Sequence, residues 1–556
     1  MRSKTKVLVS LLGTGAVFSL SACVALPTSG QVQASEIEVG SNQPLLGLSA
    51  PGPVADGSPE EIVTGFIRAC SAGFSDDFTV ARSFLAPKAA VDWKPDTQVK
   101  IFDTNDGIDI TVANDGAVEA SAKAVGSVDE NGKYSVTDST ALVQERFSLV
   151  KGADNQWRIS SLEDGVILSQ SAFSSIYASS PVYFLAPDHK DLVPDLRWYP
   201  RRRLSSYLVN ALLAGPLEPL QTAATSVFLP GTTLRGGTVE VFDRVANVPL
   251  DTPQAFTDPH AIALAYWQIG ATLRDVSGIS AVSLSLGNVP LENTEPINDP
   301  SGTQNPVMVQ DGNLIRLVSE KIEVLIPATA LGNLTISHPA VSADGKTIVF
   351  TDTSGQRLYL WSRQTAVKLL EGRELLAPSV DRVGWIWSAN RAKAGQVMAL
   401  KPDGTRVDLD LPWQDSSELE TVTVSPDGTR LAAVRRVNGK DQVTLALIVR
   451  DQNGSPLSLL GAQDVELGSE PVVSLAWVQG YSLVALTGTD DKTTVRIIPL
   501  FGPVSSLPGV KNASGLAAGK TENQIYLVTA AGELYQRSGR NWQHALSGVH
   551  DPTYPG

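Results

Sequence analysis

Histidine is the first residue type to search for a reaction centre, because imidazole serves both acid–base and metal chemistry near neutral pH. Five histidines occur, at positions 189, 260, 338, 544 and 550. None forms a His-Glu-x-x-His pattern or a pair at the spacing of metal ligands. The Gly-x-Ser-x-Gly elbow of serine hydrolases does not occur in the sequence either. These residues therefore predict neither a metal centre nor a serine nucleophile.

Two further patterns come near known binding loops. Residues 515–521 read Gly-Leu-Ala-Ala-Gly-Lys-Thr, which is one residue too short between its glycines for a phosphate-binding loop. The Asp-Gly turns at 344–345 and 427–428 lack the alternating oxygen ligands of an EF-type calcium loop. We interpret both patterns as turns of a repeat fold.

Acidic pairs give no clear acid–base site. Glu60 with Glu61 and Asp76 with Asp77 stand at expected helix starts, where they favour the helix dipole. A hydrolase that uses two carboxylates needs acids converging from different elements. The channel of a ring-shaped domain would be such a place. We expect a chain without a reaction of its own, and a hydrolase with its site in the channel is the alternative.

One cluster has the residue types of a protein-binding hot spot. Arg197 and Trp198 are followed by Arg201, Arg202 and Arg203. Arginine and tryptophan are enriched at the centres of interfaces, so this cluster is a candidate partner-binding surface. The alternative is a loop whose arginines pair internally. Blade tryptophans are further candidates for exposed contacts, although they more often lie in cores; they are Trp361, Trp385 and Trp413.

The elements that would hold such residues are clearest after residue 306, where a short phrase recurs. Ser342-Ala-Asp-Gly345 and Ser425-Pro-Asp-Gly428 are each followed by an apolar, β-branched run, and their starts lie 83 residues apart (425 − 342). That spacing is about twice the 40–45 residues of a propeller blade. Residues 306–556 therefore predict a β-propeller of about five blades, or six if Asp311-Gly312 opens another. A β-sandwich with Asp-Gly hairpins is the alternative.

Bulk composition limits the class of protein. The chain has 556 residues, 42% of them hydrophobic and 18% charged, which describes a folded chain of several domains. Its net charge is −14, so nucleic acid is not an expected partner. Two cysteines, Cys23 and Cys70, exclude a disulfide framework. Cys70 falls on the apolar face of an expected helix and predicts a small buried residue.

The first residues carry export features. Residues 1–22 combine a basic start with a short apolar stretch, which predicts a signal peptide. The stretch ends in Leu20-Ser21-Ala22-Cys23, which resembles the bacterial lipobox. The resemblance implies cleavage between Ala22 and Cys23 and a covalent lipid, such as a palmitate-containing diacylglyceryl group, on the Cys23 sulfur. Residues 23–57 then form a Pro-, Gly- and Ser-rich tether.

Two α+β domains are expected between the tether and the propeller. Residues 58–170 open on a capping box at Ser58 and continue as helices followed by a strand meander, like an NTF2-like cone. Residues 178–295 resemble the GerMN domain. They contain a Tyr-Phe-Leu strand at 183–185, the helix end Leu-Leu-Ala-Gly-Pro at 212–216 and a Pro-Gly-Thr turn at 230–232. The fold class is therefore multidomain: two α+β domains, then an all-β propeller.

A lipobox, a tether, an α+β cone, a GerMN domain and a propeller in this order resemble the LpqB lipoprotein family of actinobacteria. The resemblance implies a cell-membrane lipoprotein anchored on the extracytoplasmic face through Cys23. It further implies binding to the sensor ectodomain of an MtrB-like histidine kinase, with an effect on two-component signalling in cell-wall homeostasis and division. We expect no cofactor beyond the covalent lipid. A cell-wall glycan-binding protein and a propeller-type hydrolase are the alternatives.

Overall fold

The computed structural model describes residues 50–556 except positions 139, 255, 257, 298–304, 392–394 and 414–416. The expected signal peptide, Ala22, Cys23 and tether residues 24–49 lie outside the described residues. Residues 50–57 already contact the first domain, since the Asp56 amide donates to Gln156 Oε1 at 2.6 Å and Gln156 Nε2 donates back to Asp56 Oδ1 at 2.9 Å.

The first domain is α+β. Ser58 caps its first helix as the sequence indicates: its hydroxyl accepts from the Glu61 amide, and the Glu61 carboxylate accepts from the Ser58 amide. The main sheet has the order β6-β5-β3-β1-β7, with β2 and β4 also pairing with β3. Its elements are α1 (Pro59–Asp76), α2 (Thr79–Ser83), α3 (Pro87–Asp92), β1 (Gln98–Phe102), β2 (Asp109–Val112), β3 (Val118–Asp129), β4 (Tyr134–Val136), β5 (Leu142–Lys151), β6 (Trp157–Ser161), β7 (Val166–Ser169) and α4 (Gln170–Ile176).

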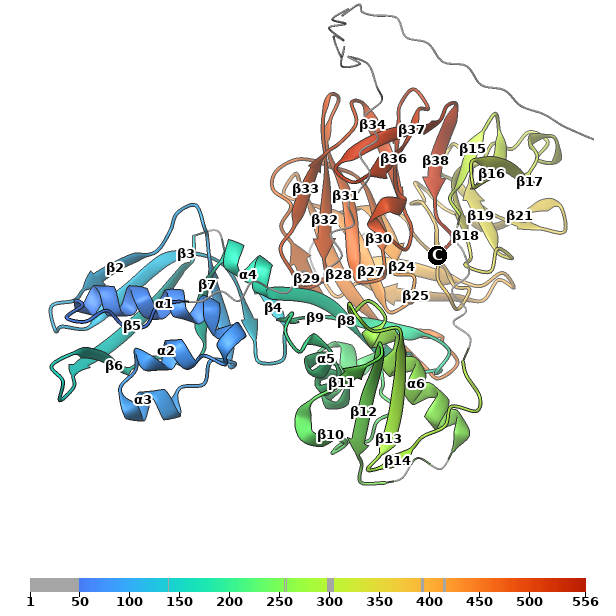
Figure 1. Cartoon of the computed structure of the whole chain (residues 1–556). Coiled ribbons are helices and arrows are strands. Elements are labelled where there is room, and N and C mark those ends of the chain that lie inside the picture. The colour runs from blue at the N-terminus through green and yellow to red at the C-terminus, as the bar shows by residue number, and fades with distance from the viewer. Residues whose placement is uncertain are drawn as a thin grey trace, which may run out of the picture. The chain divides into compact units, whose positions relative to one another are not determined.

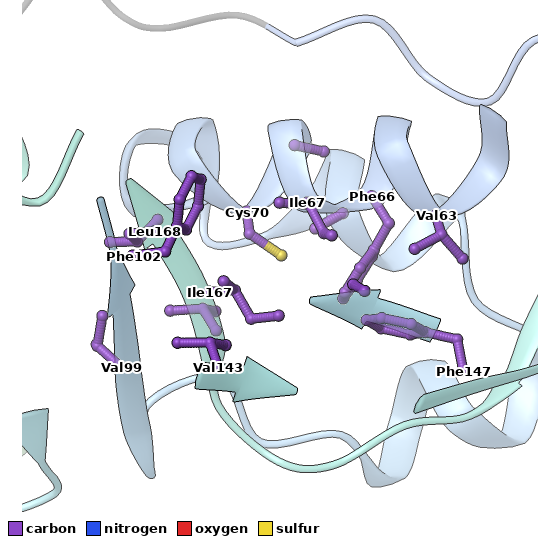
Figure 2. Close-up of a cluster of buried hydrophobic side chains, with 14 of the residues drawn as sticks. Val63, Phe66, Ile67, Cys70, Val99, Phe102, Val143, Phe147, Ile167 and Leu168 are labelled. Atoms are coloured by element: carbon purple, nitrogen blue, oxygen red, sulfur yellow. The ribbon is translucent and has the colours of Figure 1, made fainter. Parts of the chain in front are cut away.

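Helix α1 packs its apolar face on this sheet (Figure 2). Val63, Phe66 and Cys70 follow one another at helical spacing along that face and are all buried. Cys70 is 1% exposed, which confirms the sequence interpretation of it as a core residue, and burial raises the pKa of its thiol. The comparison of this domain with an NTF2-like cone stays a prediction.

The second domain is also α+β. Its elements are β8 (Tyr177–Leu185), β9 (Leu192–Pro200), α5 (Leu204–Ala214), β10 (Thr233–Leu234), β11 (Glu240–Phe242), β12 (Val245–Asp251), α6 (Pro259–Leu273), β13 (Ala281–Leu286) and β14 (Val289–Pro290). Strands β8 and β9 form a long hairpin, and a second sheet has the order β10-β12-β13-β14 with β11 on β12. Helix α5 ends where Gly215 adopts a φ of +95° before Pro216, as the Leu-Leu-Ala-Gly-Pro motif predicts.

Gln268 of α6 fixes this helix on the hairpin. It is fully buried, donates to the Tyr183 carbonyl at 3.1 Å and accepts from the Val227 amide at 2.9 Å. Both ends of the amide are thereby satisfied inside the core, which a buried polar side chain requires. Short 3₁₀ turns cover Leu220–Thr222 and Arg235–Gly237 in this domain, and Ala328–Ala330 and Glu522–Gln524 in the next.

The third domain is a β-propeller, and the described residues form six four-stranded blades (Figure 1). Blade one contains β15 (Val307–Gln310), β16 (Asn313–Val318), β17 (Lys321–Ile326) and β38 (Val549–Thr553). Blade two contains β18 (Ser337–Val341), β19 (Ile348–Thr351), β20 (Arg357–Ser362) and β21 (Thr365–Glu371). Blade three contains β22 (Ser379–Val380), β23 (Ile386–Ala389), β24 (Gln396–Leu400) and β25 (Arg406–Asp410).

Blades four to six complete the ring. They contain β26 (Glu418–Val424), β27 (Arg430–Val437), β28 (Lys440–Arg450) and β29 (Pro456–Val465); β30 (Val472–Val478), β31 (Ser482–Thr489), β32 (Lys492–Pro499) and β33 (Ser505–Pro508); and β34 (Ala513–Ala518), β35 (Ile525–Thr529), β36 (Leu534–Ser538) and β37 (Asn541–Leu546). Strand β38 returns to pair with β15, so the last strand of the chain completes the first blade. This closure removes the open sheet edges that a linear array of blades would leave.

The recurring phrase forms the same turn in two blades. In blade two, Ser342 Oγ donates to Asp344 Oδ1 at 2.6 Å and accepts from the Thr347 amide at 2.9 Å. In blade four, Ser425 Oγ donates to Asp427 Oδ1 at 2.8 Å and accepts from the Arg430 amide at 3.0 Å. The glycines that follow, Gly345 and Gly428, have φ of +72° and +71°, a backbone conformation that glycine adopts without steric cost.

The structure therefore confirms the propeller, decides for six blades and excludes the sandwich alternative. The Asp311-Gly312 turn does open a blade, since it joins β15 to β16. The Gly-Leu-Ala-Ala-Gly-Lys-Thr stretch lies largely in strand β34, where a phosphate-binding loop has no place. Trp385 and Trp413 are buried, so these two are core residues rather than exposed contacts.

Candidate functional site

The arginine cluster begins in strand β9, where Arg197 and Trp198 make hydrogen bonds inside the fold. Arg197 is 2% exposed; its Nη2 donates to Asp195 Oδ2 at 2.7 Å and its Nη1 to the Asn131 carbonyl at 2.9 Å. Trp198 Nε1 donates to the Phe501 carbonyl at 2.6 Å. Arg197 thus has no exposed surface to offer a partner, because a buried guanidinium has to be paired within the fold.

The other three arginines are exposed but also have internal partners. Arg201 Nε donates to the Ser175 carbonyl at 3.2 Å, and Arg202 Nη1 donates to the Phe74 carbonyl at 3.3 Å. Arg203 Nη2 lies 3.7 Å from Asp77 Oδ1. All four arginines of the cluster therefore have partners within the chain, as the alternative of internal pairing predicts. Binding of a partner through the cluster stays a prediction that concerns only its exposed members.

A larger candidate site lies in the propeller. A cavity of about 1700 Å³ is lined by the inner strands of all six blades, β38, β18, β22, β26, β30 and β34, and it is therefore the propeller channel. Residues of the β8–β9 hairpin and of α6 also line the cavity. The hairpin is tied to blade three, because Arg382 Nη2 and Nη1 lie 3.1 and 3.2 Å from the two oxygens of Asp188.

Five of the six inner strands share a local irregularity. The pairing register shifts within β18, β26, β30 and β34, and again where β15 pairs with β38. A β-bulge leaves a residue out of the ladder and redirects its side chain. The inner-strand residues omitted from these ladders all line the cavity; they are His338, Pro339, Glu420, Val473, Ser514, Asp551 and Pro552. We call these seven residues the bulge ring.

Charged groups of the bulge ring are paired. The Glu420 carboxylate lies 2.7 Å from Arg391 Nη2 and 3.5 Å from Arg436 Nη1. Arg436 Nε also donates to Asp441 Oδ1 at 3.1 Å, and these ionic contacts raise the pKa of Arg436 above its ordinary value. Glu420 is thus an anion held between two cations, which is the geometry of an ion-pair network rather than of a poised proton donor.

The seam between blades one and two contains strained backbone. His338 and Asp551 have φ of +45° and +50°, which non-glycine residues rarely adopt. The strain is held by hydrogen bonds, since Asp551 Oδ2 accepts from the His338 amide at 3.1 Å and Ser337 Oγ lies 2.8 Å from His338 Nδ1. Both residues belong to the bulge ring, which lies near the start of these inner strands and so toward one end of the channel; we call this end the channel mouth.

Two carboxylates do converge from different elements, but in the first domain. Lys100 Nζ bonds Glu145 from β5 and lies 2.8 Å from Glu163 Oε2. Burial raises the pKa of Glu145, and the Lys100 ammonium acts in the opposite direction. The ammonium occupies the space between the two acids, where a glycosidase would bind its sugar. Among the described side chains, no group of three or more His, Cys, Asp or Glu is arranged to hold a metal ion.

Sequence reasoning missed the bulge ring and the arginines that pair with it. These residues are spread over more than 200 positions and only the ring closure brings them together. The available signal was their place near the start of five of the six inner strands, but a bulge has no sequence signature that reveals it.

Comparison with known proteins gives the family. The chain matches the "Lipoprotein LpqB, N-terminal domain" model over residues 52–174 and the "Lipoprotein LpqB beta-propeller domain" model over residues 312–555. Residues 181–292 match the "Sporulation and spore germination" model. A protein named Lipoprotein LpqB from Cutibacterium acnes is 25% identical, with 97% of this chain and 98% of that protein covered. The chain belongs to the LpqB lipoprotein family.

Other LpqB relatives give the same picture. The protein of that name from Mycobacterium tuberculosis is 26% identical, with 90% of this chain and 89% of the relative covered. TolB from Acinetobacter baumannii is a similar solved structure, at 16% identity and a TM-score of 0.34, with 46% of this chain and 67% of that chain covered. None of the helices described in residues 50–556 has the length and apolarity to cross a membrane.

Proposed function

We propose that this LpqB-family chain is a membrane lipoprotein, anchored by lipid on Cys23 at the extracytoplasmic face, that binds the sensor ectodomain of a histidine kinase of the Mtr type. Its binding shifts the kinase between signalling states and so influences cell-wall homeostasis and division. A ligand shifts such an equilibrium only through its different affinities for the two states. The chain needs no reaction of its own for this role.

The observation that carries the proposal is the propeller channel in a chain of this family. The channel is lined from every blade, and bulges direct side chains of five blades into it. Its mouth carboxylates Glu420 and Asp551 already have partners within the fold, which favours recognition over acid–base chemistry. Lipid attachment restricts the chain to one surface and raises its effective concentration near membrane receptors.

Two measurements test the proposal. The full-length lipoprotein, in detergent, should retain the purified kinase ectodomain in a pull-down, and phosphotransfer by the kinase in vesicles should change when the lipoprotein is added. Replacing Cys23→Ser should release the chain from the membrane fraction without loss of ectodomain binding in solution. An ectodomain that binds neither form, with unchanged kinase activity, contradicts the proposal.

A further inference from the structure

Several residues of the inner strands that line the channel have short, uncharged side chains. They include Thr421, Thr423, Ser474, Ala476, Gly515 and Ala517. These positions offer hydroxyl groups to a ligand, and leucine and tryptophan side chains such as Leu475 and Trp477 also line the cavity.

The inner strands also present backbone groups toward the channel, because each is the edge of its blade. Neighbouring blades satisfy some of these groups: Ser379 Oγ accepts from the Val424 amide at 3.2 Å, and Ser474 Oγ accepts from the Leu516 amide at 3.3 Å. Edge groups of this kind can also be bonded by an added extended peptide.

The structure contains an example of such bonding. Residues 554–556 of the chain line the same cavity beyond β38. The Gly556 amide donates to the carbonyl of Val341 in β18 at 3.0 Å. The ring of Tyr554 lies so close to Gly519 that a Cβ there would stand 2.8 Å from it. The channel thus contains a short segment of the chain itself, which makes one backbone hydrogen bond to an inner strand.

Two exposed guanidinium groups lie at the bulge ring. Arg391 and Arg436 remain 43% and 44% exposed, whereas the Glu420 carboxylate between them is only 18% exposed. A guanidinium has five N–H donors, so both arginines keep donors beyond those used for Glu420 and Asp441. In these ion pairs the guanidinium groups are therefore more exposed than the carboxylates, and Asp551, His338 and His550 line the same cavity.

We propose that the mouth of the propeller channel, at the bulge ring with Arg391 and Arg436, binds an extended acidic polypeptide segment of a partner protein. This rests on the proposed function and assigns the site within it. The acidic side chains bond the two guanidinium groups, and the backbone of the segment follows the free edges of the inner strands. The backbone bonding favours a peptide over an anionic polysaccharide, which has no amide ladder to offer strand edges.

The test uses the full-length lipoprotein in detergent and a fluorescein-labelled (Glu-Ser)₆ peptide, with binding followed by fluorescence polarisation. Arg391→Gln should weaken binding by at least about tenfold, the loss expected for one charge-assisted hydrogen bond. Arg406→Gln is the matched control, because Arg406 on outer strand β25 is 39% exposed and paired with Asp408. It should bind as the unaltered chain does, and a (Gln-Ser)₆ peptide should bind more weakly.

A second variant distinguishes a loss of peptide binding from a change in folding caused by Arg391→Gln. Ser514 is exposed in the bulge ring, and Ser514→Tyr should block the mouth with the arginines intact and lower peptide affinity by a similar factor. Absence of peptide binding, equal binding by Arg391→Gln, or tighter Arg391-dependent binding of hyaluronate would overturn the proposal. If the kinase ectodomain is still retained in that case, the proposed function stands and only the site is wrong.

Discussion

The ion pair between blades three and four is the contact whose loss should be easiest to measure. Asp381 is 1% exposed and precedes β23, and Arg450 ends β28. Asp381 Oδ1 accepts from the amides of Val383 and Trp385, each at 2.9 Å. Asp381 Oδ2 accepts from Trp387 Nε1 at 2.8 Å and from Arg450 Nη2. One carboxylate therefore satisfies four donors, three of which are buried.

The substitution Asp381→Asn keeps the size of the side chain but removes half of these acceptors. If the amide oxygen stays on the two backbone amides, its NH₂ faces the indole and the guanidinium, which are both donors. Each unsatisfied buried donor costs about 1–3 kcal/mol. Arg450 would also keep a buried charge without its anion, a change that costs about 3–5 kcal/mol in comparable pairs. Because these losses overlap, we expect a loss of about 3–5 kcal/mol of local stability.

Native-state hydrogen exchange of the full chain measures this loss of stability in the segments around the ion pair. Peptides covering 379–390 and 443–450 should exchange faster in Asp381→Asn, while those from the first domain should not change. Asp403→Asn is the control, since Asp403 occupies an exposed Asp-Gly turn and accepts from the Thr405 amide at 2.9 Å. The double variant Asp381→Asn/Arg450→Met should recover part of the loss. A change below about 1 kcal/mol in the single variant would refute the reasoning, because it falls within the range of ordinary surface substitutions.

Three further predictions concern single residues. Gly73→Ala should destabilise the first domain by about 1–3 kcal/mol in chemical denaturation, because its Cβ would stand 2.1 Å from the Phe78 ring, whereas Gly270→Ala in α6 has space and should be neutral or stabilising. The hydrogen bond that Ser342 Oγ donates lowers the pKa of Asp344 to about 2. The stability that ionised Asp344 contributes is therefore present above pH 3.8 and lost as the pH falls toward 2. Asp344→Asn should flatten the fall in melting temperature at acidic pH. The buried Cys70 thiol, with its raised pKa, should resist iodoacetamide at pH 8 in the native chain and react on unfolding, as mass spectrometry would show.

Elements with strong local signals were predictable. The capping box at Ser58, the helix that ends before Gly215 and the Asp-Gly turns all have a local physical cause, and the structure contains each of them. Strand β9 was not predicted, because Val193–Pro200 combines two prolines with charged residues and has no clear alternation. Its burial comes from the domains around it. Helix α3 starts at Pro87, since proline fits the first turn of a helix.

The candidate sites also differ in how much of them the sequence could predict. The arginine cluster was visible as a run of neighbouring residues, but sequence could not reveal that Arg197 is paired with Asp195 inside the fold. The channel mouth was invisible, because His338, Glu420 and Asp551 come from three blades and share no motif.

The sequence by itself determined the order of the domains, the repeat that makes a propeller, and the lipobox on which the proposed anchoring depends. These are properties of neighbouring residues, whose turns, caps and apolar periods act over a few positions. Only the tertiary structure decided the number of blades, the partners of each charged side chain and the composition of the channel. Those depend on ring closure and burial, which join residues hundreds of positions apart and which no local pattern encodes.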